Sequence, residues 1–250
     1  MNVVVRTHGG IGNQIFQLLY ARLYAATHGA ALFEIHDSRY EHGFKRSAEL
    51  ASAPAPPDRL RAVSALRLPK IATKLNWRRD AVTLFGTTYL DGYFQRVVDY
   101  APFGDALLRE ELLRLRAELG VAPAPAHGMG VHLRLGDFFR SEAAVTAHVA
   151  ERLARIDAGA SIITNEESRL ATPAVAATLA SAGARFVPTG DMTPEEVLRT
   201  LAGFARVDGN DSTLLFWASV LSGMACDYRN PELSALRDRF IRLSSGPATP

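Results

Sequence analysis

The sequence is poor in the features that mark secreted, metal-binding and membrane-spanning proteins. It has one cysteine, Cys226, which excludes an internal disulfide and a zinc site built on several cysteines. A single cysteine also fits a reducing, cytosolic compartment. No run of about 18 uncharged apolar residues occurs, and the first residues lack the charged start and longer apolar run of a signal peptide. We therefore expect a soluble, cytoplasmic protein that contacts at most the inner face of a membrane.

The chain also has little net charge. Its 250 residues include 28 basic and 26 acidic side chains, for a formal charge of +2. This balance indicates no nucleic acid partner, although a local basic patch can still steer a phosphate-bearing ligand. Basic side chains and Trp77 gather over residues 59–79. Such a run usually only faces water, but this one could also lie on an anionic membrane face.

Two strand–loop–helix patterns, separated by a proline-rich segment, predict the fold. The first opens with the β-branched run Val3–Val5, continues through a glycine-rich turn, and leads into helically spaced apolar residues over 13–28. Residues 122–126 read Ala-Pro-Ala-Pro-Ala, a linker composition. Short strands and helices alternate again after it, which indicates parallel sheets with helices on both faces. We predict an α/β protein of two Rossmann-like domains, 1–122 and 127–250, facing a cleft.

The glycine-rich turn is the first candidate binding element. It places Gly10, Gly12 and Asn13 at the start of the predicted helix, where bare backbone amides suit an anion. It is not a dinucleotide fingerprint, because Ile15 stands where the last glycine of that motif belongs. This counts against a Rossmann oxidoreductase. A tight turn that binds nothing remains an equally good interpretation of this motif alone.

The second candidate element begins at His132 and reads His-Leu-Arg-Leu-Gly-Asp-Phe. It ends the first strand predicted after the linker, and ligands of open α/β sheets bind beyond the carboxyl ends of strands. Strand alternation puts His132 and Arg134 on one face and the two leucines on the other. An imidazole and a bidentate guanidinium on one face suit a nucleotide diphosphate. The alternative is a structural ion pair between Arg134 and Asp137.

Polar residues also end or begin three other predicted elements. Asp211 or Ser212 can cap a helix with a buried apolar body, which by itself is most simply an ordinary core helix. The segments 91–95 and 164–167 follow predicted strands, and each alone is a weak signal of a site.

Taken together, these segments resemble the α-1,2-fucosyltransferases, with a remoter similarity to the α-1,6- and protein O-fucosyltransferases. Residues 9–17 resemble the signature G-G-L-G-N-Q-M-F-Q, residues 91–95 resemble G-Y-[WF]-Q, and residues 132–138 resemble H-x-R-R-G-D-[FY]. Residues 163–166 and 211–221 stand where that family has F-S-D-D and N-S-S-F-S-W-W-G-A-W-L. The five motifs occur in the family's order over nearly the whole chain.

The resemblance implies a GT-B-like fold and an inverting, metal-independent transferase that moves L-fucose from GDP-L-fucose to a hydroxyl of an oligosaccharide or glycolipid, with galactose O2 as the family's acceptor atom. The first domain would hold the acceptor, with the basic stretch 59–79 on the acceptor side or on a membrane face, and the second domain would hold the GDP-sugar. The residues carried over for binding the donor are Gly10, Gly12, Asn13, His132, Arg134, Asn165, Ser212 and Thr213.

Catalysis would rest on Arg134 and Asp137. The absence of a D-x-D pair and of a His/carboxylate cluster agrees with the expectation of no metal and no cofactor. Arg134 would then stabilise the charge that grows on the departing diphosphate. Asp137, Asp91 and His8 are the candidate general bases.

Two departures from the family pattern keep other functions open. Leu135 replaces the second arginine of the H-x-R-R motif, and Asn165 and Glu166 replace the paired aspartates. The chain could therefore be a non-catalytic relative that binds a nucleotide sugar or glycan, or a transferase for a different GDP-sugar. Hydrolysis of the donor without acceptor would separate an enzyme from a pure binding protein.

Overall fold

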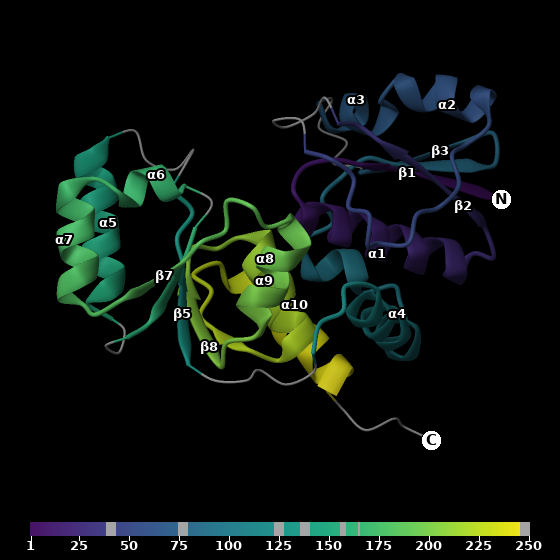
Figure 1. Cartoon of the computed structure of the whole chain (residues 1–250). Helices are drawn as coiled ribbons and strands as arrows, with labels where there is room; N and C mark the ends of the chain where they lie inside the picture. The colour runs from purple at the N-terminus through teal and green to yellow at the C-terminus, as the bar shows by residue number, and fades with distance from the viewer. Residues whose placement is uncertain are drawn as a thin grey trace. The chain divides into compact units, whose positions relative to one another are not determined.

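The protein is described from a computed structural model, which covers residues 1–38, 44–74, 80–122, 128–135, 141–155, 159–164 and 166–245. Contacts between Cα atoms divide the chain into two units (Figure 1). The first comprises Met1–Gly120 together with the residues from Ala235 onward, and the second comprises Val121–Ser234. Residues from 235 onward, which the sequence analysis assigned to the second domain, thus group with the first unit.

The first unit is built on a four-stranded sheet of order β2-β1-β4-β3. Its strands are β1 (Asn2–Thr7), β2 (Ala31–His36), β3 (Ala81–Leu84) and β4 (Thr87–Leu90). Its helices are α1 (Ile11–Thr27), α2 (Asp58–Ala65), α3 (Leu68–Lys74) and α4 (Asp105–Glu118), with a 3-10 turn at Val97–Tyr100. Strand β1 runs parallel to both β2 and β4, and only β3 is antiparallel to its neighbour.

Apolar periodicity places the layers of this unit. Helix α1 buries Ile15, Phe16, Leu19 and Leu23 completely, which is the spacing of one helix face. Helix α2 covers the other face of the sheet, where Leu60 packs with side chains of β1 and β4. Figure 1 shows α2 and α3 on one side of the strands and α1 and α4 on the other. The sheet is therefore covered on both faces, as parallel strands require.

The second unit is a five-stranded, all-parallel sheet of order β7-β6-β5-β8-β9. Its strands are β5 (Met129–His132), β6 (Ser161–Ile163), β7 (Arg185–Val187), β8 (Arg206–Gly209) and β9 (Ala225–Cys226). Its helices are α5 (Glu142–Leu153), α6 (Glu167–Leu170), α7 (Pro173–Ser181), α8 (Pro194–Ala202) and α9 (Thr213–Ser222). Helix α10 (Pro231–Ser245) begins here and continues into the first unit.

Two helix layers cover this second sheet (Figure 1). Val131 and Leu133 of the central strand pack with Val145 and Val149 of α5 and with Val175 of α7 in one apolar cluster. The helices α8 and α9 pair with each other on the opposite face. The α/β class predicted from the sequence is confirmed, since both units carry parallel strands between helices. The cleft between two domains is not part of either unit and stays a prediction.

Among the described helices, none combines the length and apolar character that crossing a bilayer requires.

Candidate functional site

The order of the second sheet singles out one edge as a ligand site. Strands β6 and β7 lie on one side of β5, whereas β8 and β9, which come later in the chain, lie on the other. The order therefore reverses between β5 and β8, and open α/β sheets bind ligands outside the carboxyl ends of the strands at that point. Gly209 ends β8 there, and a Cβ on it would lie 3.1 Å from the His132 carbonyl oxygen and 2.9 Å from Leu215. Glycine is thus needed for these two strand ends to approach.

His132 is the last residue of β5 and is 6% exposed. Burial, with a smaller effect from the nearby Arg134 guanidinium, lowers the pKa of His132 to about 4. The imidazole is therefore neutral at physiological pH, with one nitrogen a donor and the other an acceptor. Its Nδ1 atom is buried and has no hydrogen-bond partner among the described residues. A neutral ring with an unsatisfied nitrogen at a switch point is suited to a polar ligand such as a nucleobase or ribose.

Arg134 lies two residues beyond the strand and is partly exposed, whereas its neighbours Leu133 and Leu135 are fully buried. Both leucines belong to the apolar cluster under α5. The alternation predicted from the sequence is thus present, and it separates the polar pair from the leucines. A second guanidinium lies at the same strand end, because Arg169 of α6 donates a hydrogen bond from Nη1 to the Leu135 carbonyl oxygen at 2.6 Å. Sequence analysis missed Arg169, and no motif marks it.

The start of α9 lies at the end of β8 and is held firmly. Ser212 is the N-cap, and its Oγ accepts a hydrogen bond from the Leu215 amide at 3.1 Å. Tyr228 donates its hydroxyl hydrogen to the Ser212 carbonyl oxygen at 3.0 Å. The Asp211 carboxylate accepts hydrogen bonds from the amides of Arg229 and Asn230, at 2.9 and 2.8 Å. Ser212 therefore caps the helix, while Asp211 fixes the loop that follows β9.

The predicted donor-binding residues fall into three groups. His132, Arg134, Ser212 and Thr213 all lie at the carboxyl ends of β5 and β8 or at the start of α9. Gly10, Gly12 and Asn13 lie in the first unit, at the start of α1. Asp137 and Asn165 lie outside the described residues, so their roles stay predictions.

The glycine-rich turn of the first unit follows β1 and is locked by two glutamines of the same motif. Gln14 donates from Nε2 to the carbonyl oxygens of Gly9 and Lys45, at 2.9 and 2.8 Å, and accepts from the Ser47 amide at 2.9 Å. Gln17 accepts a hydrogen bond from the His8 amide at 3.0 Å. Gly9 has a φ of 75°, which favours glycine. These two glutamines thus act on the shape of the turn.

Two motifs recognised separately in the sequence meet in this unit. Asn13 accepts a hydrogen bond through Oδ1 from Gln95 Nε2 at 3.1 Å. Asn13 begins the helix after β1, and Gln95 follows β4, the strand beside β1. The motifs therefore share the carboxyl-end edge of the first sheet, where its strand order also reverses.

The Asp91 carboxylate lies among several basic side chains at the carboxyl-end edge of the first sheet. It is 3% exposed, and three cationic groups approach it: Arg67 Nε at 3.2 Å, Arg6 Nε at 3.7 Å and Lys70 Nζ at 3.8 Å. The His8 imidazole also lies close, with Nε2 at 3.5 Å. Burial acts to raise the pKa of Asp91, but the contacts with His8, Lys70 and Arg67 outweigh it, and the pKa is lowered. The carboxylate therefore remains ionised and is a weak base.

This burial bears on the candidate general bases. His8 is 0% exposed and stands edge-on to the Tyr93 ring, with centroids 5.1 Å apart. Neither His8 nor Asp91 presents a side chain to solvent in this structure, where the two contact each other at the loop ends, and their role as general bases stays a prediction. The sequence could have indicated this burial, because His8 and Asp91 each directly follow a strand whose side chains are mostly buried.

The basic stretch of residues 59–79 divides into two kinds of side chain over its described part. Arg67 and Lys70 turn towards Asp91 and are 29% and 28% exposed. Arg59 and Arg61 on α2 are exposed, as are the apolar side chains of Leu66 (59%) and Ile71 (47%). Trp77 and residues 75–79 lie outside the described part.

Within the described ranges, no group of three or more His, Cys, Asp or Glu side chains is placed to hold a metal ion. Comparison with known proteins finds no matching family model and no matching curated protein.

Several solved structures resemble the chain. The crystal structure of NodZ α-1,6-fucosyltransferase co-crystallized with GDP matches with a TM-score of 0.49 and 15% identity, over 88% of this chain and 92% of that one. A selenomethionine form of fucosyltransferase NodZ from Bradyrhizobium gives 0.47 and 16%, over 88% and 91%. The α-1,6-fucosyltransferase NodZ soaked with GDP-fucose gives 0.45 and 15%, over 88% and 92%. TM-scores below 0.5 at such identities do not identify the function of this chain.

Proposed function

We propose that the protein is an inverting glycosyltransferase that moves L-fucose from GDP-L-fucose to a hydroxyl of a glycan acceptor. One observation carries this proposal: His132, Arg134 and the Ser212-capped start of α9 converge at the switch point between β5 and β8. Such a point receives nucleotides in open α/β sheets. The choice of GDP-fucose over other nucleotide sugars comes from the five sequence motifs, two of which meet in the Asn13–Gln95 hydrogen bond.

In this reaction the site has to stabilise the leaving group, GDP. The acceptor oxygen attacks the anomeric carbon of fucose, the bond from that carbon to the phosphate oxygen breaks, and negative charge collects on the GDP diphosphate. The proton of the acceptor hydroxyl passes to a general base, for which Asp137 is the candidate, or to the departing diphosphate. Arg134 would meet that charge with two donors in a fixed fork. The Thr213 hydroxyl and the amides of the first turn of α9 would supply further hydrogen bonds. Arg169 brings a second guanidinium to the strand end where the related signature has one at position 135.

The finer part of the proposal concerns the acceptor. The resemblance to α-1,2-fucosyltransferases favours transfer to O2 of galactose. The first unit would hold this sugar at the edge formed by the glycine-rich turn, Asn13 and Gln95, because both motifs of that unit end there. Gly10, Gly12 and Asn13 would then contact the donor or orient the acceptor hydroxyl.

Donor turnover tests the proposal. The purified protein is incubated with GDP-fucose or GDP-mannose, alone and with a panel of galactosides, and GDP release and product linkage are measured. We expect GDP release from GDP-fucose, stimulated by a galactoside, with the product linked at O2. Tight binding of GDP without release from either sugar would instead identify a non-catalytic nucleotide-sugar-binding protein. Preferential turnover of GDP-mannose would overturn the donor assignment.

We also propose that the reaction needs no metal ion or other cofactor, because Arg134 supplies positive charge where metal-dependent transferases use a cation. Activity should survive excess EDTA with kcat unchanged. Loss of activity on chelation, restored by Mg²⁺ or Mn²⁺, would contradict this mechanism.

A peripheral membrane contact through residues 59–79 is proposed for a cytoplasmic form of the protein that acts on a glycolipid. The exposed Arg59, Arg61, Leu66 and Ile71 support it, although Arg67 and Lys70 are engaged with Asp91. Each basic residue adds only about 1 kcal/mol at an anionic surface, so salt should weaken the contact. Co-sedimentation with anionic but not neutral vesicles at low salt would support it. Equal, negligible binding to both would favour a free oligosaccharide acceptor.

A further inference from the structure

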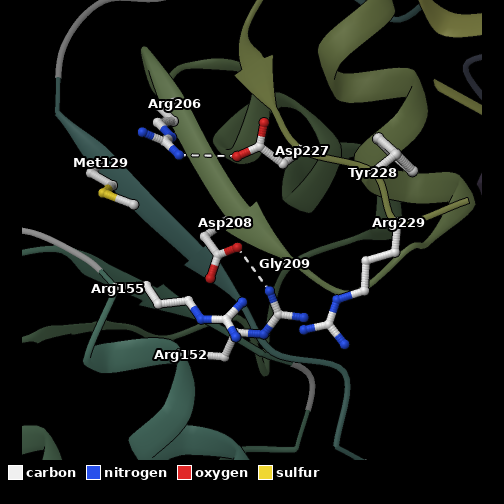
Figure 2. A pocket seen from close by; sticks show the side chains of 9 residues that line it. All are labelled: Met129, Arg152, Arg155, Arg206, Asp208, Gly209, Asp227, Tyr228 and Arg229. Atoms are coloured by element: carbon white, nitrogen blue, oxygen red, sulfur yellow. Dashed lines mark hydrogen bonds and ion pairs between the residues drawn. The ribbon is translucent and has the colours of Figure 1, made fainter. Parts of the chain in front are cut away.

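A hollow of about 170 Å³ lies on the second unit, against β8 and the loop after β9 (Figure 2). Four arginines line it: Arg152 and Arg155 at the end of α5, Arg206 at the start of β8, and Arg229 after β9. Only two carboxylates, Asp208 and Asp227, line it with them. The hollow is comparable to cavities of about 150 Å³ that accept a ligand the size of benzene. Gly209 at the switch point and Tyr228, which bonds to the Ser212 carbonyl, also line it, so the hollow borders the donor site, but His132, Arg134, Ser212 and Thr213 are not part of its lining.

The base of the hollow is a buried ion pair with unused hydrogen-bonding capacity. Arg152 is 3% exposed, and its Nη1 donates to Asp208 Oδ1 at 2.8 Å. Arg152 Nε and Asp208 Oδ2 are both buried and have no hydrogen-bond partner among the described residues. Buried polar atoms that lack a partner are costly, so a pair of them beside a hollow calls for a ligand or ordered water. The ligand would need an acceptor for the guanidinium and a donor for the carboxylate.

The rim of the hollow adds positive charge that its acids only partly balance. Glu151 Oε1 is shared by Arg155 at 2.6 Å and Arg229 at 3.5 Å, so one carboxylate serves two guanidiniums. Both arginines are more than half exposed and can re-aim their donors. Figure 2 shows Arg152, Arg155 and Arg229 gathered on one side of Asp208, with the Arg206–Asp227 pair on the other. Clustered, forked donors of this kind suit the oxygens of a phosphate group.

We propose that this hollow is a second anion site, separate from the donor site, which binds a phosphate monoester of a small hydroxylated molecule. The phosphate lies among Arg152, Arg155 and Arg229, and a hydroxyl of the ligand donates to Asp208 Oδ2. The proposal does not depend on the identity of the sugar donor. The site's size fits a phosphoryl group with a few further atoms and is below the roughly 300 Å³ of sites that enclose a whole drug-sized ligand.

The test is a titration of the full-length, ¹⁵N-labelled protein with glycerol 3-phosphate, followed by amide NMR. We expect shifts at the amides of Arg152 and Asp227, and weaker binding of methyl phosphate, which has no hydroxyl for Asp208. The double variant Arg155→Gln/Arg229→Gln should lose affinity on the order of ten-fold or more for each guanidinium removed. Because both side chains are largely exposed, the variant should fold normally.

Arg114→Gln is the matched control. Arg114 is 53% exposed and pairs with Glu118 four residues along its helix, just as Arg155 is 54% exposed and pairs with Glu151. This control should bind like the wild type. The absence of shifts at Arg152 and Asp227 at millimolar ligand would overturn the proposal, as would displacement of the ligand by GDP, which would put it in the donor site. If the two phosphate esters bound equally well, the proposed hydrogen bond from the ligand hydroxyl to Asp208 would be excluded.

Discussion

At the scale of single residues, Leu135 shows why one motif position departs from the related signature. Its side chain is 0% exposed and belongs to the apolar cluster of β5, α5 and α7. An arginine at this position would point into that cluster, not beside Arg134. The departure thus follows from packing, and it leaves the polar face of the strand end to His132 and Arg134.

Leu135→Arg should therefore destabilise the protein without improving catalysis. An uncompensated buried charge costs about 3–5 kcal/mol, whereas the control Leu135→Met, similar in volume, should cost less than about 1.5 kcal/mol. Urea unfolding at pH 7 measures both values. An arginine variant as stable as the wild type with a raised kcat would contradict this account of the position.

Asp91 provides a second residue-scale prediction, because its carboxylate holds several cationic groups at the edge of the first sheet. Asp91→Asn should lower the free energy of unfolding at pH 7 by about 3 kcal/mol, since the buried Arg6 and the partly buried Arg67 and Lys70 lose their shared anionic partner. The exposed control Asp227→Asn, whose side chain is 83% exposed, should change it by less than about 1 kcal/mol.

The pH dependence of this effect follows from the lowered pKa of Asp91. Its stabilisation is fully present above the unfolded-state pKa of about 3.9 and is lost as the pH falls through the lower folded-state value. The stability difference between wild type and Asp91→Asn should thus shrink below about pH 4. A difference that stayed constant from pH 7 to pH 3 would argue against the ionised carboxylate as its source.

At the scale of elements, the glycine-rich turn illustrates how a motif residue can act through structure. Gln14→Leu removes three hydrogen bonds, to Gly9, Lys45 and Ser47, while Gln17→Leu removes one, from the His8 amide. Each buried group left without a partner costs about 1–3 kcal/mol. Thermal unfolding should therefore rank the variants in that order of damage. The reverse order would show that these hydrogen bonds do not hold the turn.

Much of the element order could be predicted from sequence, because long apolar patterns dominate it. The strand at Val3–Val5 and helix α1 lie where the apolar pattern puts them, although α1 starts at Ile11, two residues before the predicted Asn13. The early start occurs because Gly10 adopts the extended backbone of an N-cap without any side chain.

Other elements have an apolar pattern that is too weak or too short to predict them from the sequence. Strand β8, of sequence Arg-Val-Asp-Gly, has one fully buried apolar residue, Val207, so alternation could not mark it. That strand forms one half of the switch point, and its absence from the prediction hid both Gly209 and Asp208. Helix α10 was also missed, although Leu236 and Phe240 are buried at helical spacing. Its partner Tyr100, whose ring lies 5.0 Å from that of Phe240, is far away in sequence.

At the scale of the whole molecule, both units repeat one arrangement: a central first strand with later strands on its two sides, and polar residues at the carboxyl ends where the order reverses. The sequence motifs lie at these two edges, the glycine-rich turn and residues 91–95 in one unit, and His132 and Arg134 in the other. The repeated arrangement explains why motifs that are distant along the chain lie at these two sheet edges.

The measurement that tests the account most directly is the turnover of GDP-fucose by Arg134→Lys, compared with the wild type and with the control Arg185→Lys on the exposed start of β7. If Arg134 stabilises the departing diphosphate, lysine cannot replace its fork, and kcat should fall about 100- to 1000-fold, which corresponds to about 3–4 kcal/mol. The control should keep wild-type activity. A folded Arg134→Lys variant that turns over GDP-fucose within a few-fold of the wild type would contradict the assignment of this strand end as the catalytic site.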